Sequence, residues 1–145
     1  MRNLVVFLVL SVVSNLCIAQ EWEADFSKAL KSTSVNNKSL LLVFSGSDWC
    51  IPCMKLERNI WESEAFKSYA KENLVLYRAD FPQKKKNKLA EELTNSNKVL
   101  AEKYNYKGYF PLVVLLDSKG NTLGEMGYEN IPPTAYVAKI KALLP

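Results

Sequence analysis

Residues 40–53 read Leu-Leu-Leu-Val-Phe-Ser-Gly-Ser-Asp-Trp-Cys-Ile-Pro-Cys. The five apolar residues at the start have the length and composition of a strand. The two cysteines at the end are three positions apart, so they can close into a small disulfide ring and reopen by exchange. This stretch therefore predicts a strand that leads into a pair of thiols suited to two-electron redox chemistry.

The cysteine count limits what these thiols can do. The chain has only Cys17, Cys50 and Cys53, and it has no histidine. A structural zinc site needs four Cys or His ligands, so one chain cannot complete it and two chains would have to share a half-site. A purely structural disulfide gains most from closing a long loop, whereas this pair encloses two residues. Redox chemistry is the favoured interpretation.

The position of the pair at the start of a predicted helix separates the roles of the two thiols. If the helix starts around Cys50, its sulfur lies over unpaired backbone N–H groups and the positive end of the helix dipole, which stabilise a thiolate. We therefore expect Cys50 to be the nucleophile. We expect Cys53, one turn further on and more deeply buried, to resolve the mixed disulfide. Pro52 suits the first helical turn, where its missing N–H would have no partner.

Residues 1–19 have the pattern of a secretory signal peptide. A positive charge is followed by an apolar stretch and small residues, and cleavage after Ala19 would leave Gln20 first in the mature chain. The apolar stretch is too short to predict a membrane span. A lipid anchor on Cys17 is disfavoured by the bulky Leu16 before it. We expect export to the periplasm, with secretion or lipid anchoring through Cys17 as the alternatives.

Residues 20–145 have the size of one domain. The full chain has an apolar content of 48% and a formal net charge of +4, both of which are ordinary for a globular protein. The mild positive balance is concentrated in a lysine cluster, Lys84, Lys85, Lys86 and Lys88. A single cluster is not the basic face with interleaved aromatics that nucleic-acid binding needs. We expect a monomer with no nucleic-acid partner, no metal, and no cofactor beyond a redox-active disulfide between Cys50 and Cys53.

The rest of the sequence alternates between helical and extended patterns. Helical spacing of apolar residues runs from Trp22 to about Thr33, and a long helix after Cys50 is expected to break near Glu62-Ser63-Glu64. Residues 81–97 are polar and show only weak helical periodicity. The remaining predictions are strands at 74–80, 112–116 and 122–126, a hairpin turn at 117–121, a helix from Val99 to Tyr104 that Gly108 ends, and a helix from Pro132-Pro133 to Leu144. This order predicts an α/β fold with helices on both faces of a mixed sheet.

Three segments of the chain resemble the thioredoxin superfamily. They are residues 44–53, with Trp directly before the cysteine pair, residues 106–111, with a proline opening the third strand, and the hairpin with Asp117 and Gly120. The chain is similar to exported thioredoxin-like proteins of the kind that includes the C-terminal domain of the bacterial transmembrane thiol reductant transporter. The resemblance implies a thioredoxin fold over residues 20–145. That fold has a central mixed four-stranded sheet flanked by helices, with an N-terminal helix and a helical insertion before the cis-proline strand.

The resemblance also implies roles for individual residues. Pro111 matches the cis-proline beside the two sulfurs, and the backbone of Phe110 would pair with an extended substrate segment. Gly127 matches the glycine on the far side of the substrate groove, where a side chain would obstruct an approaching peptide. Trp49 would cover the disulfide, although an aromatic residue there could equally be core packing.

Two features depart from the pattern of thioredoxin. The first strand of thioredoxin carries a buried aspartate that assists proton transfer to the inner cysteine, whereas residues 42–44 here are apolar. Asp48 is the nearby candidate for proton transfer through water, but an aspartate that stabilises the helix start is the favoured interpretation. The stretch between Asp80 and Val99 is also longer than in small thioredoxins. Its lysines form either a partner-docking surface or a solvated insertion, and we expect the second.

The dipeptide between the cysteines bears on the direction of electron flow. Strongly oxidising relatives carry a histidine there that stabilises the reduced form, whereas this chain has Ile51 and Pro52. We expect a protein disulfide reductase that acts on disulfide-containing client proteins and is re-reduced by a membrane thiol donor. A disulfide oxidase or isomerase of the same fold is the alternative, and two thiolates would also suit a Cu(I) carrier. A binding module with unused cysteines is disfavoured by the cysteine pair, Trp49 and Pro111 together.

Overall fold

The computed structural model describes residues 20–145, so the signal peptide predicted at residues 1–19, with Cys17, lies outside the described residues. The elements in chain order are α1 (Phe26–Asn36), β1 (Ser39–Ser45), α2 (Ile51–Leu56), the π-helical segment η1 (Glu57–Trp61), α3 (Glu64–Asn73), β2 (Leu74–Asp80), the 3₁₀ turn η2 (Lys85–Asn87), α4 (Glu91–Tyr104), β3 (Leu112–Leu116), β4 (Thr122–Met126) and α5 (Pro133–Leu143). Within residues 20–145, no helix combines the length and apolar character that crossing a membrane requires.

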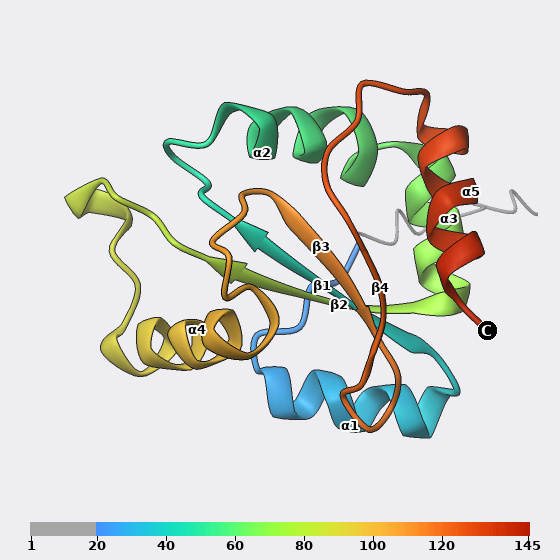
Figure 1. Ribbon diagram of the computed structural model, residues 1–145, viewed down its shortest axis with the longest axis horizontal. Coiled ribbons are helices and arrows are strands. Elements are labelled where there is room, and N and C mark those ends of the chain that lie inside the picture. Colours follow the sequence, from blue (N-terminus) through green and yellow to red (C-terminus); the bar gives the residue numbers. More distant parts are fainter. Residues whose placement is uncertain (1–19) are drawn as a thin grey trace, which may run out of the picture.

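The four strands form one mixed sheet in the order β2-β1-β3-β4 (Figure 1). Strand β1 pairs with β2 in parallel and with β3 antiparallel, and β4 pairs antiparallel with β3. The register places Phe44 of β1 opposite Ala79 of β2 and Leu112 of β3. The end of β1 therefore lies beside the end of β2 and the beginning of β3. This arrangement confirms the predicted four-stranded mixed sheet.

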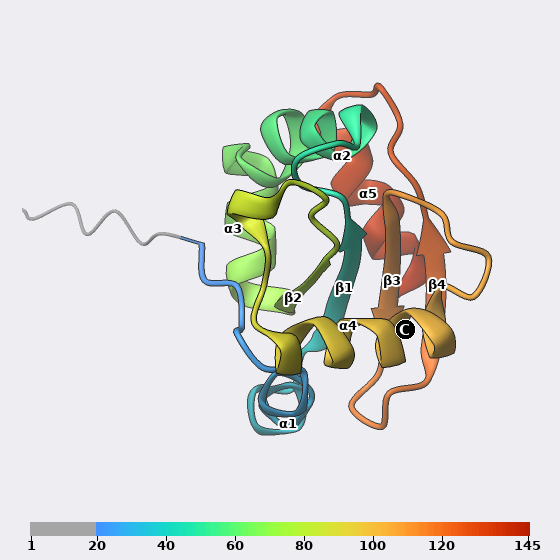
Figure 2. The same ribbon diagram turned by 90° about the vertical axis from the view of Figure 1, so that its left-hand side faces the viewer.

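Alternate residues of β1 enter two separate hydrophobic clusters. Leu41 and Val43 pack under α2, η1, α3 and α5, whereas Leu40, Leu42 and Phe44 pack under α1 and α4. Figures 1 and 2 show these two layers of helices on opposite faces of the sheet. Because both faces are covered, the strand reads as a continuous apolar run in the sequence rather than as an alternating one.

The first helix begins later and ends later than predicted. It begins at Phe26 because Asp25 is the N-cap, whose carboxylate accepts a hydrogen bond from the Lys28 N–H at 2.7 Å. Trp22 lies before the helix, in a segment whose next residue forms a parallel bridge with Tyr77 of β2. The helix ends at Asn36 rather than Thr33, since Asn37 takes a left-handed conformation with φ of 53°.

The helix after the cysteine pair is interrupted, as predicted, but the irregularity begins earlier. From Glu57 the backbone is π-helical, and the Glu62 N–H bonds to the Glu57 carbonyl at 3.0 Å. Ser63 then caps α3 by accepting a hydrogen bond from the Phe66 N–H at 3.2 Å. The last helix agrees with the prediction to within one residue at its C-terminal end.

The prediction that a helix spans Val99 to Tyr104 is wrong at its start, because α4 begins at Glu91. Its buried positions are Asn97, Leu100 and Tyr104, which follow helical spacing but include a polar residue. Asn97 is satisfied in the interior by hydrogen bonds to Tyr77 and to the Asp80 carbonyl. Apolar periodicity cannot detect a helix whose first half buries only this amide. The structure thus contains the helical insertion before β3 that the resemblance implied.

Candidate active site

The cysteine pair lies directly after the central strand, at the start of α2. The Cys50 N–H bonds to the Gly46 carbonyl at 2.9 Å, which closes a tight turn after β1. Cys50 is the N-cap of α2, and its sulfur accepts the backbone N–H of Cys53 at 3.3 Å. Pro52 lies in the first turn of the helix. This geometry confirms the predicted placement of Cys50 over the unpaired N–H groups of a helix start.

The two sulfurs are joined in a disulfide, with the Cα atoms 5.2 Å apart. The prediction that Cys53 is the more buried thiol is wrong for this oxidised form, because each cysteine is 4% exposed. Because the two sulfur atoms are bonded to each other, the two cysteines are buried to the same extent. The difference between the two thiols is therefore one of position, since it is the Cys50 sulfur that caps the helix.

The residues implied by the resemblance lie near the end of β1, where the chain leads into the cysteine pair. The Phe110–Pro111 peptide bond is cis, as expected, and Pro111 is buried at the start of β3, next to the end of β1. Phe110 lies beyond the last ladder pair, Phe44 with Leu112, and no turn or loop hydrogen bond within residues 20–145 uses its backbone. A Cβ on Gly127 would lie 3.9 Å from the Pro111 carbonyl oxygen, which places Gly127 beside the cis-proline.

Trp49 is a surface residue rather than part of the core, and it is 39% exposed. Its indole N–H donates to the Phe81 carbonyl at 2.7 Å, and its ring lies 5.4 Å from that of Phe110. The ring also lies across Gly46, where a Cβ would be 2.3 Å from an indole carbon. Gly46 is therefore required for this ring position, because any side chain there would overlap the indole.

Asp48 binds the loop that follows β2. One carboxylate oxygen accepts the Gln83 N–H at 2.9 Å, and the other accepts the Lys84 N–H at 3.0 Å and the Asn87 side-chain amide at 2.8 Å. The hydrogen bonds from Gln83 and Asn87 are the main causes that lower the pKa of Asp48. A carboxylate engaged in this way is a poor proton carrier near neutral pH. The structure thus favours a positioning role for Asp48 over the proton-transfer role that we considered from the sequence.

A cavity of about 410 Å³ reaches Cys53 from the face of the sheet that α2 covers. Its lining includes Glu57, one turn beyond Cys53, and Arg78 of β2, and these two residues form an ion pair. Burial is the main cause that raises the pKa of Glu57, although Arg78 opposes the shift. Strand β1 supplies no carboxylate here, but Glu57 supplies one from η1. The cavity therefore holds a carboxyl group that could exchange a proton with the inner thiol.

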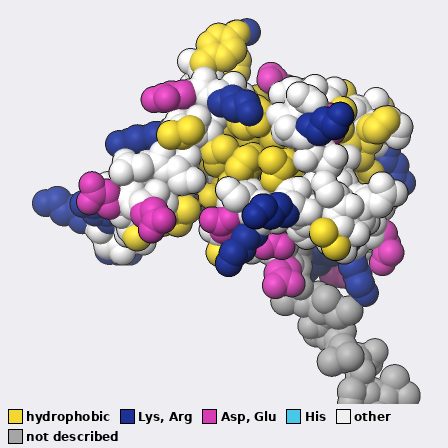
Figure 3. Space-filling view, turned by 90° about the horizontal axis from the view of Figure 1, so that it is seen from below, with side chains coloured by type: hydrophobic (Ala, Val, Ile, Leu, Met, Phe, Trp, Pro, Cys, Tyr) yellow, Lys and Arg dark blue, Asp and Glu magenta, His cyan; other side chains and the backbone are white. Residues whose placement is uncertain are grey.

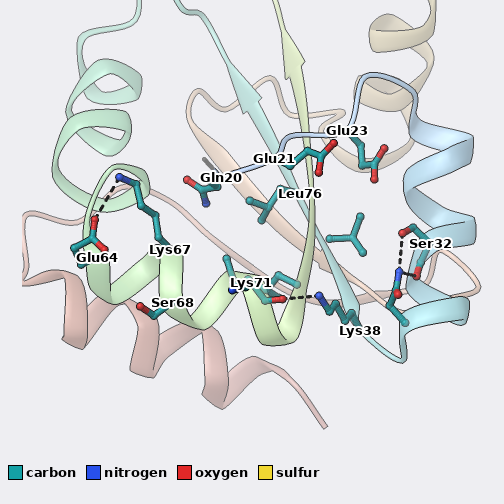
Figure 4. Close-up of a pocket in the computed structure, with 14 residues that line it drawn as sticks. Gln20, Glu21, Glu23, Ser32, Lys38, Glu64, Lys67, Ser68, Lys71 and Leu76 are labelled. Carbon is teal, nitrogen blue, oxygen red and sulfur yellow. Dashed lines mark hydrogen bonds and ion pairs between the residues drawn. The ribbon is translucent and has the colours of Figure 1, made fainter. Parts of the chain in front are cut away.

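Sequence reasoning did not single out Gly46, Phe81, Glu57 or Arg78. The Ser-Gly-Ser turn before Trp49 was a signal for Gly46, whereas the pairing of Glu57 with Arg78 has no signal in a linear sequence. A second hollow lies between α1 and α3 at the beginning of β2, away from the cysteines, and Figure 4 shows it lined by acidic and basic side chains. Within residues 20–145, no group of three or more His, Cys, Asp or Glu side chains is placed to hold a metal.

Comparisons with known proteins agree with this geometry. A family model described as thioredoxin-like matches residues 21–118. The Chlamydia pneumoniae protein named disulfide bond reductase DsbH is 38% identical over 124 residues, which are 86% of this chain and 72% of that protein. A solved structure named DsbH oxidoreductase superposes with a TM-score of 0.78 at 38% identity and covers 86% of this chain and 83% of its own. The oxidised C-terminal domain of DsbD from Neisseria meningitidis, at 16% identity, shares the fold with a TM-score of 0.58 over 84% of this chain and 98% of its own.

The contact between Gly46 and the Trp49 ring can be tested by Gly46→Ala. We expect the ring to leave its position, the hydrogen bond to Phe81 to be lost, and the free energy of unfolding to fall by about 1–3 kcal/mol, as in other overpacked sites. The shift of the Trp49 indole N–H resonance reports the displacement. Gly127→Ala is the matched control, because its Cβ makes only an ordinary contact at 3.9 Å and the resonance should not move. An unshifted resonance in Gly46→Ala would contradict the assigned packing.

The cavity beside Cys53 predicts that Glu57→Gln slows the step in which Cys53 releases a mixed disulfide. We expect a loss of about 10- to 100-fold, at or below the lower end of general-base catalysis, together with a flatter pH profile, because the raised carboxyl pKa no longer contributes. Single-turnover release from a Cys50 adduct measures this step. Glu72→Gln removes the same charge from an exposed residue of α3 that does not line the cavity, and it should leave the rate unchanged. Equal effects of the two substitutions would point to net charge instead.

Proposed function

Because the chain belongs to the thioredoxin-like family and is a thiol–disulfide oxidoreductase with a Cys50–Cys53 disulfide, we propose that it works as an exported protein disulfide reductase. The observation that carries this proposal is the Cys50 sulfur at the N-cap of α2, where it accepts the Cys53 N–H. A thiolate at that position is stabilised and is available to attack a disulfide. The helix start identifies the attacking sulfur, whereas the direction of electron flow is supported by the 38% identity to a protein named a disulfide bond reductase.

The proposed reaction exchanges one disulfide for another. In the reduced protein, the Cys50 thiolate attacks one sulfur of a client disulfide, so that a Cys50–client bond forms and one client thiolate leaves. Cys53 gives up its proton, for which Glu57 is the nearby acceptor, and attacks the Cys50 sulfur. The second client thiolate then leaves. Two electrons pass to the client, its thiolates take up protons, and the protein is left with its own disulfide, so no further cofactor takes part.

The direction of electron flow follows from the surroundings of the cysteine pair. Ile51 and Pro52 bring no charge that would stabilise the reduced form, so the pair is suited to giving electrons away. The leader-like residues 1–19 support export, with the periplasm as the proposed compartment. A periplasm has no soluble reducing supply of its own, and a membrane thiol donor would therefore return the pair to the dithiol.

The reduction potential of the Cys50–Cys53 pair tests this direction. Equilibration with glutathione or thioredoxin redox buffers should give a value near the reducing end of the family, about −270 mV. A value near −120 mV would reverse the assignment to an oxidase, because such a pair would take electrons from client thiols.

The roles of the two thiols can be separated by single substitutions. Cys50→Ser should be inert towards client disulfides, because the thiolate at the helix start has gone. Cys53→Ser should accumulate a mixed disulfide through Cys50, since the residue that releases the client is missing. Affinity capture followed by non-reducing electrophoresis would reveal the adduct and identify the clients. A trapped adduct on Cys53, with turnover retained in Cys50→Ser, would refute these roles.

The proposal of export predicts that the mature chain starts at Gln20. Intact-mass analysis of protein expressed with residues 1–19 should show cleavage after Ala19. A mature chain that begins with a lipid-modified Cys17 would instead establish the anchored alternative, and uncut protein would remove the support for export.

A further inference from the structure

The lysines between β2 and α4 form a compact basic surface. We call residues 83–88 the lysine loop, and every residue in it is exposed, including Lys84, Lys85, Lys86 and Lys88. The ion pairs found within residues 20–145 join Lys67 to Glu64, Arg78 to Glu57 and Lys139 to Glu129, so none of them involves this loop. Figure 3 shows dark blue side chains at the projecting tip where Figure 1 places η2, with magenta side chains beside them.

The loop is held against the segment that leads into the cysteine pair. Asp48, two residues before Cys50, accepts hydrogen bonds from the backbone of Gln83 and Lys84 and from the Asn87 side chain. Just before the loop, the Phe81 N–H bonds to the Ser45 carbonyl at 2.9 Å, and the Phe81 carbonyl accepts the Trp49 indole N–H. A merely solvated insertion does not need such an anchor. The anchor places the lysines at a set position relative to the disulfide.

The acidic side chains near the loop do not cancel its charge through ion pairs. Asp48 is turned to the backbone of the loop, and Asp80 accepts the N–H and hydroxyl of Ser47. Glu91 and Glu92 lie in the first turn of α4, where the helix dipole favours carboxylates. The loop lysines are therefore exposed to solvent and take part in none of the ion pairs within residues 20–145.

Exposed apolar side chains adjoin the cysteine pair and the cis-proline in the chain. Ile51 is 64% exposed, Tyr109 is 57% exposed, and Trp49 is partly exposed. We propose that the lysine loop binds acidic segments of the client protein while the client disulfide is attacked at Cys50. This inference rests on the proposed function and names its substrate class, which is disulfides flanked by Asp or Glu. A client fits better than an anionic membrane or an RNA, because the loop is anchored two residues from the reacting cysteine.

The test uses two peptides that contain the same cystine loop, one flanked by glutamates and the other by serines. The reduced protein should react about tenfold faster with the glutamate peptide at low ionic strength, a ratio at the lower end of electrostatic steering, and high salt should bring the ratio close to one. Changing Lys84, Lys85 and Lys86 together to Ser should abolish this advantage and leave the rate with the serine peptide unchanged. The triple variant should unfold at the same temperature as the unchanged protein, because the three side chains are exposed.

Two further variants distinguish an effect of the loop lysines from an effect of the protein's net charge. Changing Lys28, Lys31 and Lys119 to Ser removes the same charge from exposed positions on α1 and the β3–β4 turn, at the other end of the sheet, and should keep the preference. Asp48→Ala makes the protein more positive but releases the loop, so it should lower the ratio of the two rates. A raised ratio in Asp48→Ala, or equal losses in the two lysine variants, would overturn the inference in favour of net charge.

A binding measurement in which no disulfide exchange can occur distinguishes this inference from the proposed function. The oxidised protein should bind a glutamate peptide whose cysteines are replaced by serine more tightly than the serine-flanked peptide, and only the loop lysines should matter. If neither cystine peptide is reduced but this binding is observed, the proposed function fails and the docking surface stands. If both peptides are reduced at equal rates and bound equally, the docking surface fails. Lysine-dependent retention on phosphatidylglycerol vesicles, without a peptide preference, would assign the loop to a membrane instead.

Discussion

The burial of β1 on both faces is the constraint on which the rest of the structure depends. Its residues from Leu40 to Phe44 are at most 1% exposed, and they serve two hydrophobic clusters at once. A strand in this position needs helices above and below it, and it needs hydrogen-bonded neighbours on both edges. Because β1 and β2 are parallel, the segments that follow them leave the sheet at the same edge. The redox site is built from these two segments and from the start of β3.

The two segments are joined by hydrogen bonds at nearly every step. The Ser45 carbonyl bonds to Phe81, Ser47 bonds to Asp80, Asp48 bonds to the lysine loop, and the Trp49 indole bonds back to Phe81. These hydrogen bonds therefore hold the cysteine pair and the backbone of the lysine loop in fixed positions relative to each other. A client that contacts both would meet a largely preformed surface, which reduces the ordering that binding requires.

Backbone groups and side chains make separate contributions to the redox chemistry of the site. The helix start stabilises a thiolate at Cys50 through backbone N–H groups, without any histidine in the chain. The inner thiol of Cys53 lies in the same cavity as Glu57, whose carboxyl comes from the π-helical segment rather than from the central strand. Since Arg78 pairs with Glu57, the charge state of that carboxyl depends on both helix and sheet. An oxidoreductase of this family can thus hold a carboxyl group beside its inner cysteine although β1 is entirely apolar there.

The sequence by itself determined the features that lie within contiguous residues. The apolar run before Cys50, the proline in the first helical turn, the serine that caps α3 and the hairpin after β3 were all predicted, because strand length, capping and turn chemistry are local. The cis-proline was expected from the resemblance alone. Only the tertiary structure decided the partners of Asp48, the pairing of Glu57 with Arg78 and the early start of α4 around the buried Asn97. Those hydrogen bonds join residues 17 to 39 positions apart in the chain, and such contacts leave no periodic pattern, since they exist only once the sheet has brought the segments together.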